Sequence, residues 1–211
     1  MAMNQVAAEV LAAARAMNAR GINRGAAGNV SARTDAGFLI TPTGMAYDQA
    51  TPADMVAVAM DGAAGGPRKP SSEWRFHRDI YAERREVGAV LHAHSPFATS
   101  LACMELDLPP FHYMIARFGG ADLRCARYAT FGTQELSDAV LEALRDRSGC
   151  LMAHHGMLVV GRDLGQALAL ACELEDLCEQ YWRVLQLGEP HLLAAEEMAR
   201  VLEKFRDYGQ Q

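Results

Sequence analysis

Apolar residues recur at helical spacing in several segments of this chain. In the first segment Val6, Val10, Ala13 and Met17 share one helical face, which predicts an amphipathic helix that ends before Gly21. The same period predicts further helices over residues 73–84, 135–147, 164–185 and 193–205, and a short helical turn over residues 96–103.

Shorter apolar runs predict the strands, which cover residues 38–41, 55–60, 87–92, 150–153 and 157–160. The last two flank His154-His155-Gly156, which indicates a hairpin, and the Gly-, Ala- and Pro-rich residues 61–70 are typical of a surface loop. Strands and helices mix without strict alternation. The predicted fold class is therefore α/β, a three-layer α/β/α arrangement whose largely antiparallel central sheet is covered by helices on both faces.

Length and composition fit a single folded domain over residues 1–211. Of the 211 residues, 50% are hydrophobic, which is enough for a core and too many for a disordered chain. The formal net charge of −6 and the pI of about 5.6 argue against a nucleic-acid partner, which usually meets a basic face. No run approaches the ~20 consecutive apolar residues of a membrane span, and residues 1–20 lack the layout of a signal peptide.

The chain has five cysteines, an odd number, and they form no Cys-x-x-Cys pair. Several of them lie in apolar runs, so we expect buried, reduced thiols and a cytoplasmic location. Neither a disulfide framework nor a structural zinc site is expected.

Three histidines and one carboxylate form a ligand set that is typical of a catalytic divalent-metal site. His92 and His94 are two residues apart in a strand-like run, which places both rings on one face. His155 lies at a predicted turn that can bring a third ring, and Glu73 supplies the carboxylate. The histidines alone are also compatible with side chains that bind no metal, because His-x-His pairs are common and the chain has seven histidines.

Three short segments combine hydroxyl or amide side chains with glycine or with a helix start. They are Gly28-Asn29-Val30-Ser31, Thr41-Pro42-Thr43-Gly44 and Ser71-Ser72. Such turns can bind a phosphate without a lysine, and the helix dipole favours the Ser71-Ser72 turn. Each segment taken singly is more typical of an ordinary turn or helix cap, so the phosphate hypothesis depends on their co-occurrence.

Glu73 directly follows the two serines, where a glutamate either favours the helix dipole or acts as a general acid/base beside a metal. Three aromatic residues either line a pocket or contribute to packing, namely Tyr113, Phe131 and Tyr208. The remaining histidines of interest are expected to be structural or surface residues, namely His77, His112 and His154.

The order of these motifs resembles that of the class II aldolase/adducin family, most closely its L-fuculose-1-phosphate aldolases. The matching stretches are AAGNVS (26–31), LITPTGM (39–45), KPSSEWRFH (69–77), VLHAH (90–94), FHYMIA (111–116), YATFGT (128–133), HHG (154–156) and VLEKF (201–205). They follow the family order through nearly the whole chain. The SSEWRFH, HYMIA and YATFGT blocks are more specific than the metal-type histidines.

The resemblance implies a zinc-dependent aldolase with one Zn2+ per subunit. Such an enzyme reversibly cleaves a ketose 1-phosphate, a small-molecule sugar phosphate, into dihydroxyacetone phosphate and an aldehyde. The residues that match the zinc ligands are His92, His94 and His155, and Glu73 matches the catalytic acid/base, which can also approach the metal. The phosphate-binding positions match Gly28, Asn29, Thr43, Gly44, Ser71 and Ser72.

The aldehyde side of the site is also implied by the resemblance. Tyr113 matches a proton donor there, and Phe131 and Tyr208 match residues of the aldehyde pocket. In the family the site lies at a subunit interface of a four-fold symmetric tetramer, so the resemblance implies a homotetramer in which Tyr113 acts across the interface. Arg117-Phe118 replaces a run of small residues, which predicts a reshaped aldehyde pocket or interface.

Several alternatives stay open at this stage. The substrates that fit the resemblance are L-fuculose 1-phosphate and the 5-deoxy- and 5-methylthioribulose 1-phosphates. The family's sugar-phosphate 4-epimerases typically carry aspartate at the position of Glu73, whereas its methylthioribulose-1-phosphate dehydratase keeps a glutamate. The non-catalytic scaffold branch lacks the metal ligands that this chain has.

Overall fold

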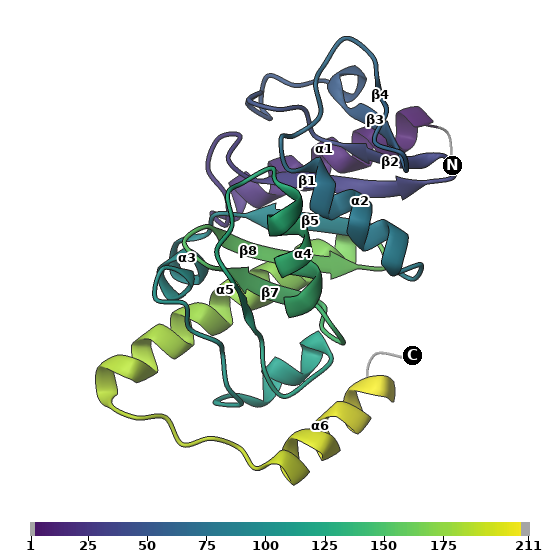
Figure 1. Ribbon diagram of the computed structural model, residues 1–211. Coiled ribbons are helices and arrows are strands. Elements are labelled where there is room, and N and C mark those ends of the chain that lie inside the picture. Colours follow the sequence, from purple (N-terminus) through teal and green to yellow (C-terminus); the bar gives the residue numbers. More distant parts are fainter. Residues whose placement is uncertain (1–2, 208–211) are drawn as a thin grey trace.

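An eight-stranded sheet forms the centre of the protein (Figure 1). The computed structural model describes residues 3–207. The strands follow the order β4-β3-β2-β1-β5-β8-β7-β6 across the sheet. Their bounds are β1 Asn29–Thr34, β2 Gly37–Ile40, β3 Val56–Ala59, β4 Ala64–Gly65, β5 Ala89–Ala93, β6 Cys125–Ala126, β7 Gly149–Met152 and β8 Gly156–Gly161.

The α-helices lie close to the positions that the sequence predicts, whereas the two 3-10 helices were not predicted. Their bounds are α1 Met3–Ala19, η1 Pro52–Asp54, α2 Trp74–Glu83, α3 Pro96–Ala102, η2 Tyr113–Phe118, α4 Gln134–Ala143, α5 Leu164–Leu187 and α6 Ala195–Asp207, where η denotes a 3-10 helix. The predicted helix over residues 135–147 is too long at its C-terminus. Asp146 has a left-handed φ of 58°, and Arg147 donates to the carboxylate of Asp122, so the chain turns there towards β7.

Two hydrophobic cores lie on opposite faces of the sheet, because alternate strand residues point to opposite sides. Val30 and Leu91 belong to the core that α1, α3 and α5 cover. Val90 and Leu158 belong to the core that α2 and α4 cover. Figure 1 shows α2 and α4 over one face and α1 and α5 over the other. The predicted central sheet between helices is therefore present.

The sheet is mixed, so the prediction of a largely antiparallel sheet is confirmed only in part. β6 runs parallel to β7, because the chain crosses over through α4 between these two strands. The other neighbouring strands are antiparallel, including the predicted hairpin of β7 and β8.

Strand β1 corrects a second prediction, since residues 28–31 were expected to form a turn. Asn29 instead pairs opposite His92, and Ser31 pairs opposite Val90, in the middle of the sheet. Asn29 and Ser31 are buried polar residues. They alternate with Val30 and therefore hide the apolar signal of a strand.

The predicted surface loop over residues 61–70 also contains the short strand β4. None of the helices between residues 3 and 207 has both the length and the apolar character that crossing a bilayer requires.

Candidate active site

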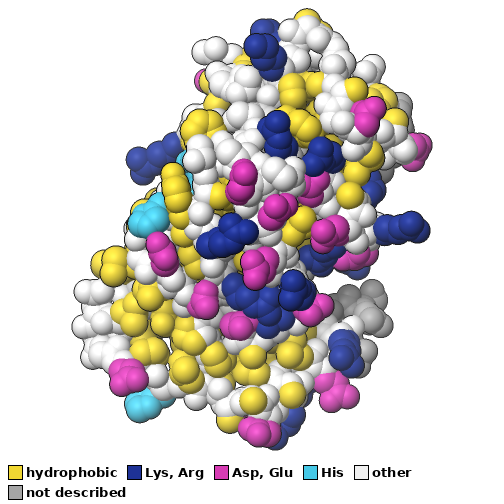
Figure 2. Space-filling view, in the orientation of Figure 1, with side chains coloured by type: hydrophobic (Ala, Val, Ile, Leu, Met, Phe, Trp, Pro, Cys, Tyr) yellow, Lys and Arg dark blue, Asp and Glu magenta, His cyan; other side chains and the backbone are white. Residues whose placement is uncertain are grey.

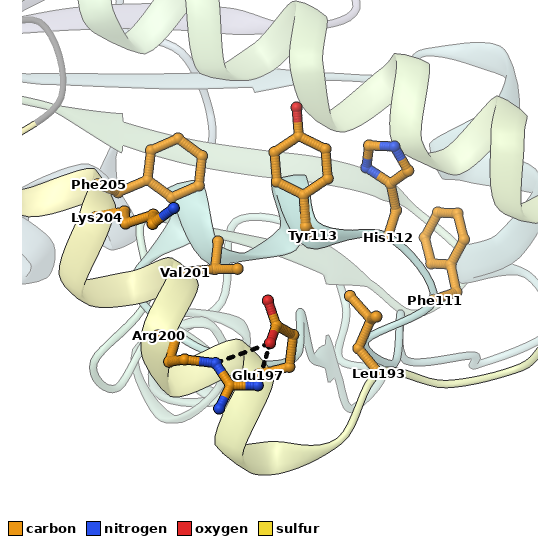
Figure 3. A pocket seen from close by; sticks show the side chains of 9 residues that line it. All are labelled: Phe111, His112, Tyr113, Leu193, Glu197, Arg200, Val201, Lys204 and Phe205. Atoms are coloured by element: carbon orange, nitrogen blue, oxygen red, sulfur yellow. Dashed lines mark hydrogen bonds and ion pairs between the residues drawn. The ribbon is translucent and has the colours of Figure 1, made fainter.

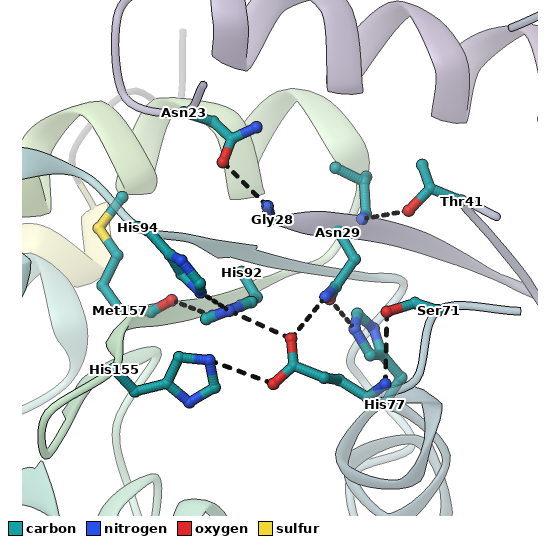
Figure 4. A network of polar contacts seen from close by, with 12 residues as sticks. Asn23, Gly28, Asn29, Thr41, Ser71, His77, His92, His94, His155 and Met157 are labelled. Carbon is teal, nitrogen blue, oxygen red and sulfur yellow. Dashed lines mark hydrogen bonds and ion pairs between the residues drawn. The ribbon is translucent and has the colours of Figure 1, made fainter. Parts of the chain in front are cut away.

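Three imidazole rings meet where β5 ends and the β7–β8 turn begins (Figure 4). His92 lies in β5, His94 directly follows it, and His155 directly precedes β8. The ring centroids of His92 lie 4.8 Å from those of both His94 and His155. The centroids of His94 and His155 are 4.9 Å apart. Their candidate ligand atoms all lie within 4.8 Å of one another. The structure therefore brings the three predicted metal ligands together.

The hydrogen bonds of His92 fix which of its nitrogens can bind a metal. Its Nδ1 lies 2.8 Å from the carbonyl oxygen of Met157, which can only accept, so Nδ1 carries the proton. The Nε2 lone pair is then free to coordinate. Burial lowers the pKa of His92 to about 3. Burial, reinforced by His92, lowers the pKa of His155 to about 4. Both rings are neutral at physiological pH, as metal ligands must be.

The carboxylate of Glu73 faces the same point from the start of α2. Its Oε1 lies 3.2 Å from Nε2 of His155, and its Oε2 lies 3.3 Å from Nε2 of His92. Oε2 also accepts a 2.9 Å hydrogen bond from Nδ2 of Asn29. Burial raises the pKa of Glu73, while His155 and the Asn29 hydrogen bond oppose that shift.

Two observations show that a divalent cation fits this cluster. The Nε2 lone pair of His92 and Nε2 of His94 lie 2.9 Å apart, and the candidate ligand atom of His155 lies within 4.8 Å of both. Among the described residues, Oε1 of Glu73 is a buried oxygen without a hydrogen-bond partner. A cation would satisfy both groups, and neutral imidazoles with a carboxylate suit zinc and related first-row metals.

The predicted phosphate positions fall into two groups. The first group begins β1, where Gly28 N–H donates to Oδ1 of Asn23 at 3.0 Å and Tyr47 donates to the Gly28 carbonyl. The Asn29 side chain lies between Glu73 and His77. In this structure these polar groups therefore already have protein partners.

The second group joins the predicted turns around Thr43 and Ser71. Pro42 and Pro70 form an antiparallel bridge. Next to it, Ser71 N–H donates to the Thr41 carbonyl. Thr43 N–H donates to the carbonyl of residue 69. Gly44 has a left-handed φ of 65°, which favours glycine there. Two turns that are far apart in sequence thus lie side by side.

A cavity of about 280 Å³ opens beside the histidines. Predicted site residues that line it are Ser72, Glu73, His94, Phe131 and His155. Sequence reasoning missed its other lining residues, which are Ala27, Tyr128, Ala129 and His154. Tyr128 and Ala129 belong to the YATFGT block that contains Phe131, so that block was the available signal.

Tyr113 does not line the cavity beside the histidines. It lines a second cavity of about 690 Å³ between η2 and α6 (Figure 3). Its ring stacks on Phe205 with centroids 6.5 Å apart. The structure therefore does not place Tyr113 in one cavity with Glu73 of the same chain. The predicted residue Tyr208 lies outside the described residues.

The Arg117-Phe118 pair is directed away from both cavities. Phe118 is fully buried in the core, and Arg117 forms a 2.6 Å ion pair with Glu173 on α5. Neither side chain lines the histidine cavity. The expected reshaping of an aldehyde pocket by Phe118 is therefore not seen within the chain.

The remaining histidines have distinct environments. His112 caps η2 by accepting from Met114 N–H, in agreement with the predicted structural role. His154 has a left-handed φ of 54° and pairs with Glu105 at 3.2 Å. His77 is fully buried and bonded to Asn29 and Ser31.

The sequence matches the family described as Class II Aldolase and Adducin N-terminal domain over residues 8–182. It is 55% identical to the 5-methylthioribulose-1-phosphate/5-deoxyribulose-1-phosphate aldolase of Rhodospirillum rubrum, across 93% of this chain and 89% of that protein. It is 42% identical to the L-fuculose phosphate aldolase of Escherichia coli (strain K12), across 99% of this chain and 98% of that protein. A solved structure of an L-fuculose 1-phosphate aldolase matches with a TM-score of 0.93 at 35% identity, covering 96% of each chain. Since the family match spans most of the sequence and the fold agrees, the chain belongs to the class II aldolase and adducin N-terminal domain family.

Proposed function

We propose that this protein is a zinc-dependent aldolase that reversibly cleaves a ketose 1-phosphate into dihydroxyacetone phosphate and an aldehyde. The observation that carries the proposal is the convergence of His92, His94 and His155 on one point that the Glu73 carboxylate also faces. Family membership supports the reaction type. The four residues at this point are the proposed metal ligands, with Glu73 also serving as acid/base.

The metal, when bound, supplies Lewis-acid stabilisation of the negative charge that develops on the substrate oxygens during cleavage. During cleavage the C4 hydroxyl loses a proton, the C3–C4 bond breaks, and C3 gains a proton. We assign the donation of this proton to C3 to Glu73, whose carboxyl group must therefore be protonated before cleavage. The burial that raises its pKa supports that assignment.

We assign the phosphate to the two groups of residues described above, namely Gly28, Asn29, Thr43, Gly44, Ser71 and Ser72. The donors are the hydroxyls of Thr43, Ser71 and Ser72 and the N–H of Gly44, because the Gly28 N–H and the Asn29 amide are bonded to protein groups. The pairing of the Thr43 turn with the Ser71 segment supports this assignment. Neutral donors at a helix start suit a phosphate.

We assign the proton at the C4 oxygen to Tyr113, or to a water molecule that it positions, with Tyr113 supplied by a neighbouring subunit of a homotetramer. Its separation from Glu73 within one chain supports an assembled site. Exposed hydrophobic residues near the end of α5, such as Trp182 and Leu187, support an interface. On the face in Figure 2, hydrophobic side chains gather in the lower half, in the region of α5 and α6.

For the substrate we propose a ketose 1-phosphate that ends in a methyl or methylthio group. The similarity to the Rhodospirillum rubrum aldolase named for 5-methylthioribulose 1-phosphate and 5-deoxyribulose 1-phosphate supports this choice. L-Fuculose 1-phosphate is the second candidate, because the structural similarity is to an aldolase named for it.

The proposal is tested by release of dihydroxyacetone phosphate from the three ketose 1-phosphates in parallel. We expect the 5-methylthio- and 5-deoxyribulose compounds to be cleaved with the higher kcat/KM. A preference for L-fuculose 1-phosphate would reassign the substrate. No release from any of them would refute the aldolase and favour an epimerase or a dehydratase.

Removal of the metal provides a second test. Dialysis against a chelator is expected to abolish cleavage, and added Zn2+ is expected to restore it. Full turnover by protein shown to be metal-free would contradict the proposed ligand set.

A further inference from the structure

A chain of buried polar side chains runs from α2 through β1 to the Glu73 carboxylate. The Tyr81 hydroxyl lies 2.8 Å from Oγ of Ser31, and that Oγ lies 2.7 Å from Nδ1 of His77. Nε2 of His77 lies 2.5 Å from Oδ1 of Asn29. Nδ2 of Asn29 then donates to Oε2 of Glu73 at 2.9 Å. Figure 4 shows the His77 ring beside the Asn29 side chain.

The direction of donation is set at both ends of this chain. Among the described residues the buried Tyr81 hydroxyl has two partners, the backbone N–H of Val90, which can only donate, and Oγ of Ser31, so Tyr81 must donate to Ser31. Ser31 then has its own proton for Nδ1 of His77, which leaves the His77 proton on Nε2. At the other end Oε2 of Glu73 accepts from the Asn29 amide nitrogen at 2.9 Å, so Oδ1 of Asn29 faces His77. The partners at both ends therefore agree with hydrogen-bond donation that runs from Tyr81 towards Glu73.

The surroundings of His77 and Tyr81 preserve this proton arrangement. His77 is fully buried, with Phe76 stacked at 4.7 Å and Phe38 at 6.4 Å between ring centroids. Burial holds the pKa of His77 well below its usual value. Burial also raises the pKa of Tyr81. A neutral imidazole and a protonated phenol are therefore the stable forms.

We infer that Tyr81, Ser31 and His77 are positioning residues, which form a one-way donor chain that holds the Asn29 amide nitrogen towards Glu73. The inference rests on the proposed function for the role of Glu73 in proton transfer. A reversed Asn29 amide would set Oδ1 against the Glu73 carboxylate. That contact between two acceptors would displace Oε1, the oxygen that faces His155. The donor bond from His77 prevents this reversal.

The first test compares two substitutions at position 77. His77→Gln keeps an N–H donor near the position of Nε2, and His77→Leu removes it at similar size. We expect His77→Leu to lower kcat by about 10- to 100-fold with little change in KM, as for other supporting partners of a metal site. His77→Gln is expected to recover most of that loss. Equal kcat in both variants, with thermal unfolding and metal content unchanged, would overturn the inference.

The second test does not require activity. Nitrogen-15 NMR of the full-length, zinc-loaded protein is expected to show His77 protonated at Nε2 and unprotonated at Nδ1. Ser31→Ala removes the donor to Nδ1, so we expect the Nδ1-protonated tautomer to appear in that variant. The opposite tautomer in the wild type would overturn the donor chain. If the predicted tautomer is found but no ketose phosphate is cleaved, the proposed function fails while the donor chain stands.

Discussion

At Gly28, the residue before β1, any side chain would collide with the strand that carries the metal-type histidines. A Cβ there would lie 2.3 Å from the His92 carbonyl oxygen and 2.8 Å from Oδ1 of Asn23. We expect Gly28→Ala to lower the free energy of unfolding by about 1–3 kcal/mol and to weaken zinc binding, because the backbone of His92 must shift. Urea unfolding and zinc titration would measure both effects.

Gly65 provides the matched control for that substitution. It lies in the short strand β4, and a Cβ at Gly65 would have no heavy atom within 4 Å. Gly65→Ala should therefore change stability by less than about 0.5 kcal/mol. If Gly28→Ala and Gly65→Ala change the free energy of unfolding equally, the collision at Gly28 does not destabilise the protein.

Substitution of Glu73 tests the proposed proton transfer directly. Glu73→Gln keeps the size of the side chain but removes the transferable proton, so we expect kcat to fall by about 10²- to 10⁴-fold. Glu179→Gln on α5 is the control, since Glu179 forms a partly exposed ion pair with Arg183. Retained turnover in Glu73→Gln would move the acid/base role to another group.

At the scale of elements, α5 holds α3 in place through one buried carboxylate. Glu175 accepts from the Ser95 hydroxyl at 2.6 Å and from the N–H groups of Phe97 and Ala98 at 2.8 and 2.9 Å. These donors directly follow His94. Glu175→Ala removes the acceptor that these three donors share, so we expect a loss of about 3 kcal/mol in unfolding free energy and weaker zinc binding.

Glu173 on the same helix is the comparison for that measurement. It forms a partly exposed ion pair with Arg117, which is worth less than about 1 kcal/mol. A similar loss in Glu173→Ala and Glu175→Ala, measured by urea unfolding, would contradict the proposed link between α5 and α3.

The sequence predicts the amphipathic elements well, because one face of each contacts a core. The helical period of α1 and α5 is regular, and the structure confirms both helices. β1 was missed because Asn29 and Ser31 are buried polar residues of the donor chain. β6 was missed because it has only two residues.

The candidate site was predictable only in part. The spacing of His92 and His94 and the family resemblance identified the cluster of three histidines. The donor chain was not predictable, because Ser31 lies 46 residues from His77 and 50 from Tyr81 in sequence. Such contacts follow from strand register, and a single sequence does not specify the partners of a buried histidine.

At the scale of the whole molecule, the separation of Tyr113 from Glu73 predicts complementation between subunits. Glu73→Gln and Tyr113→Phe should each be impaired alone. If each site combines Glu73 of one chain with Tyr113 of another, unfolding and refolding a 1:1 mixture should restore about a quarter of the sites. Activity no higher than the mean of the two parents would place both residues within one chain or remove Tyr113 from the reaction.

The sheet ends on both sides in strands of only two residues, β4 and β6. A long free edge would offer a row of unpaired backbone groups to another chain and promote aggregation, and very short edge strands are one way in which proteins avoid it. The paired length therefore falls to two residues at each border of the eight strands. We expect concentrated native protein to resist polymerisation through its sheet edges, so that such aggregation would first require loss of the native fold.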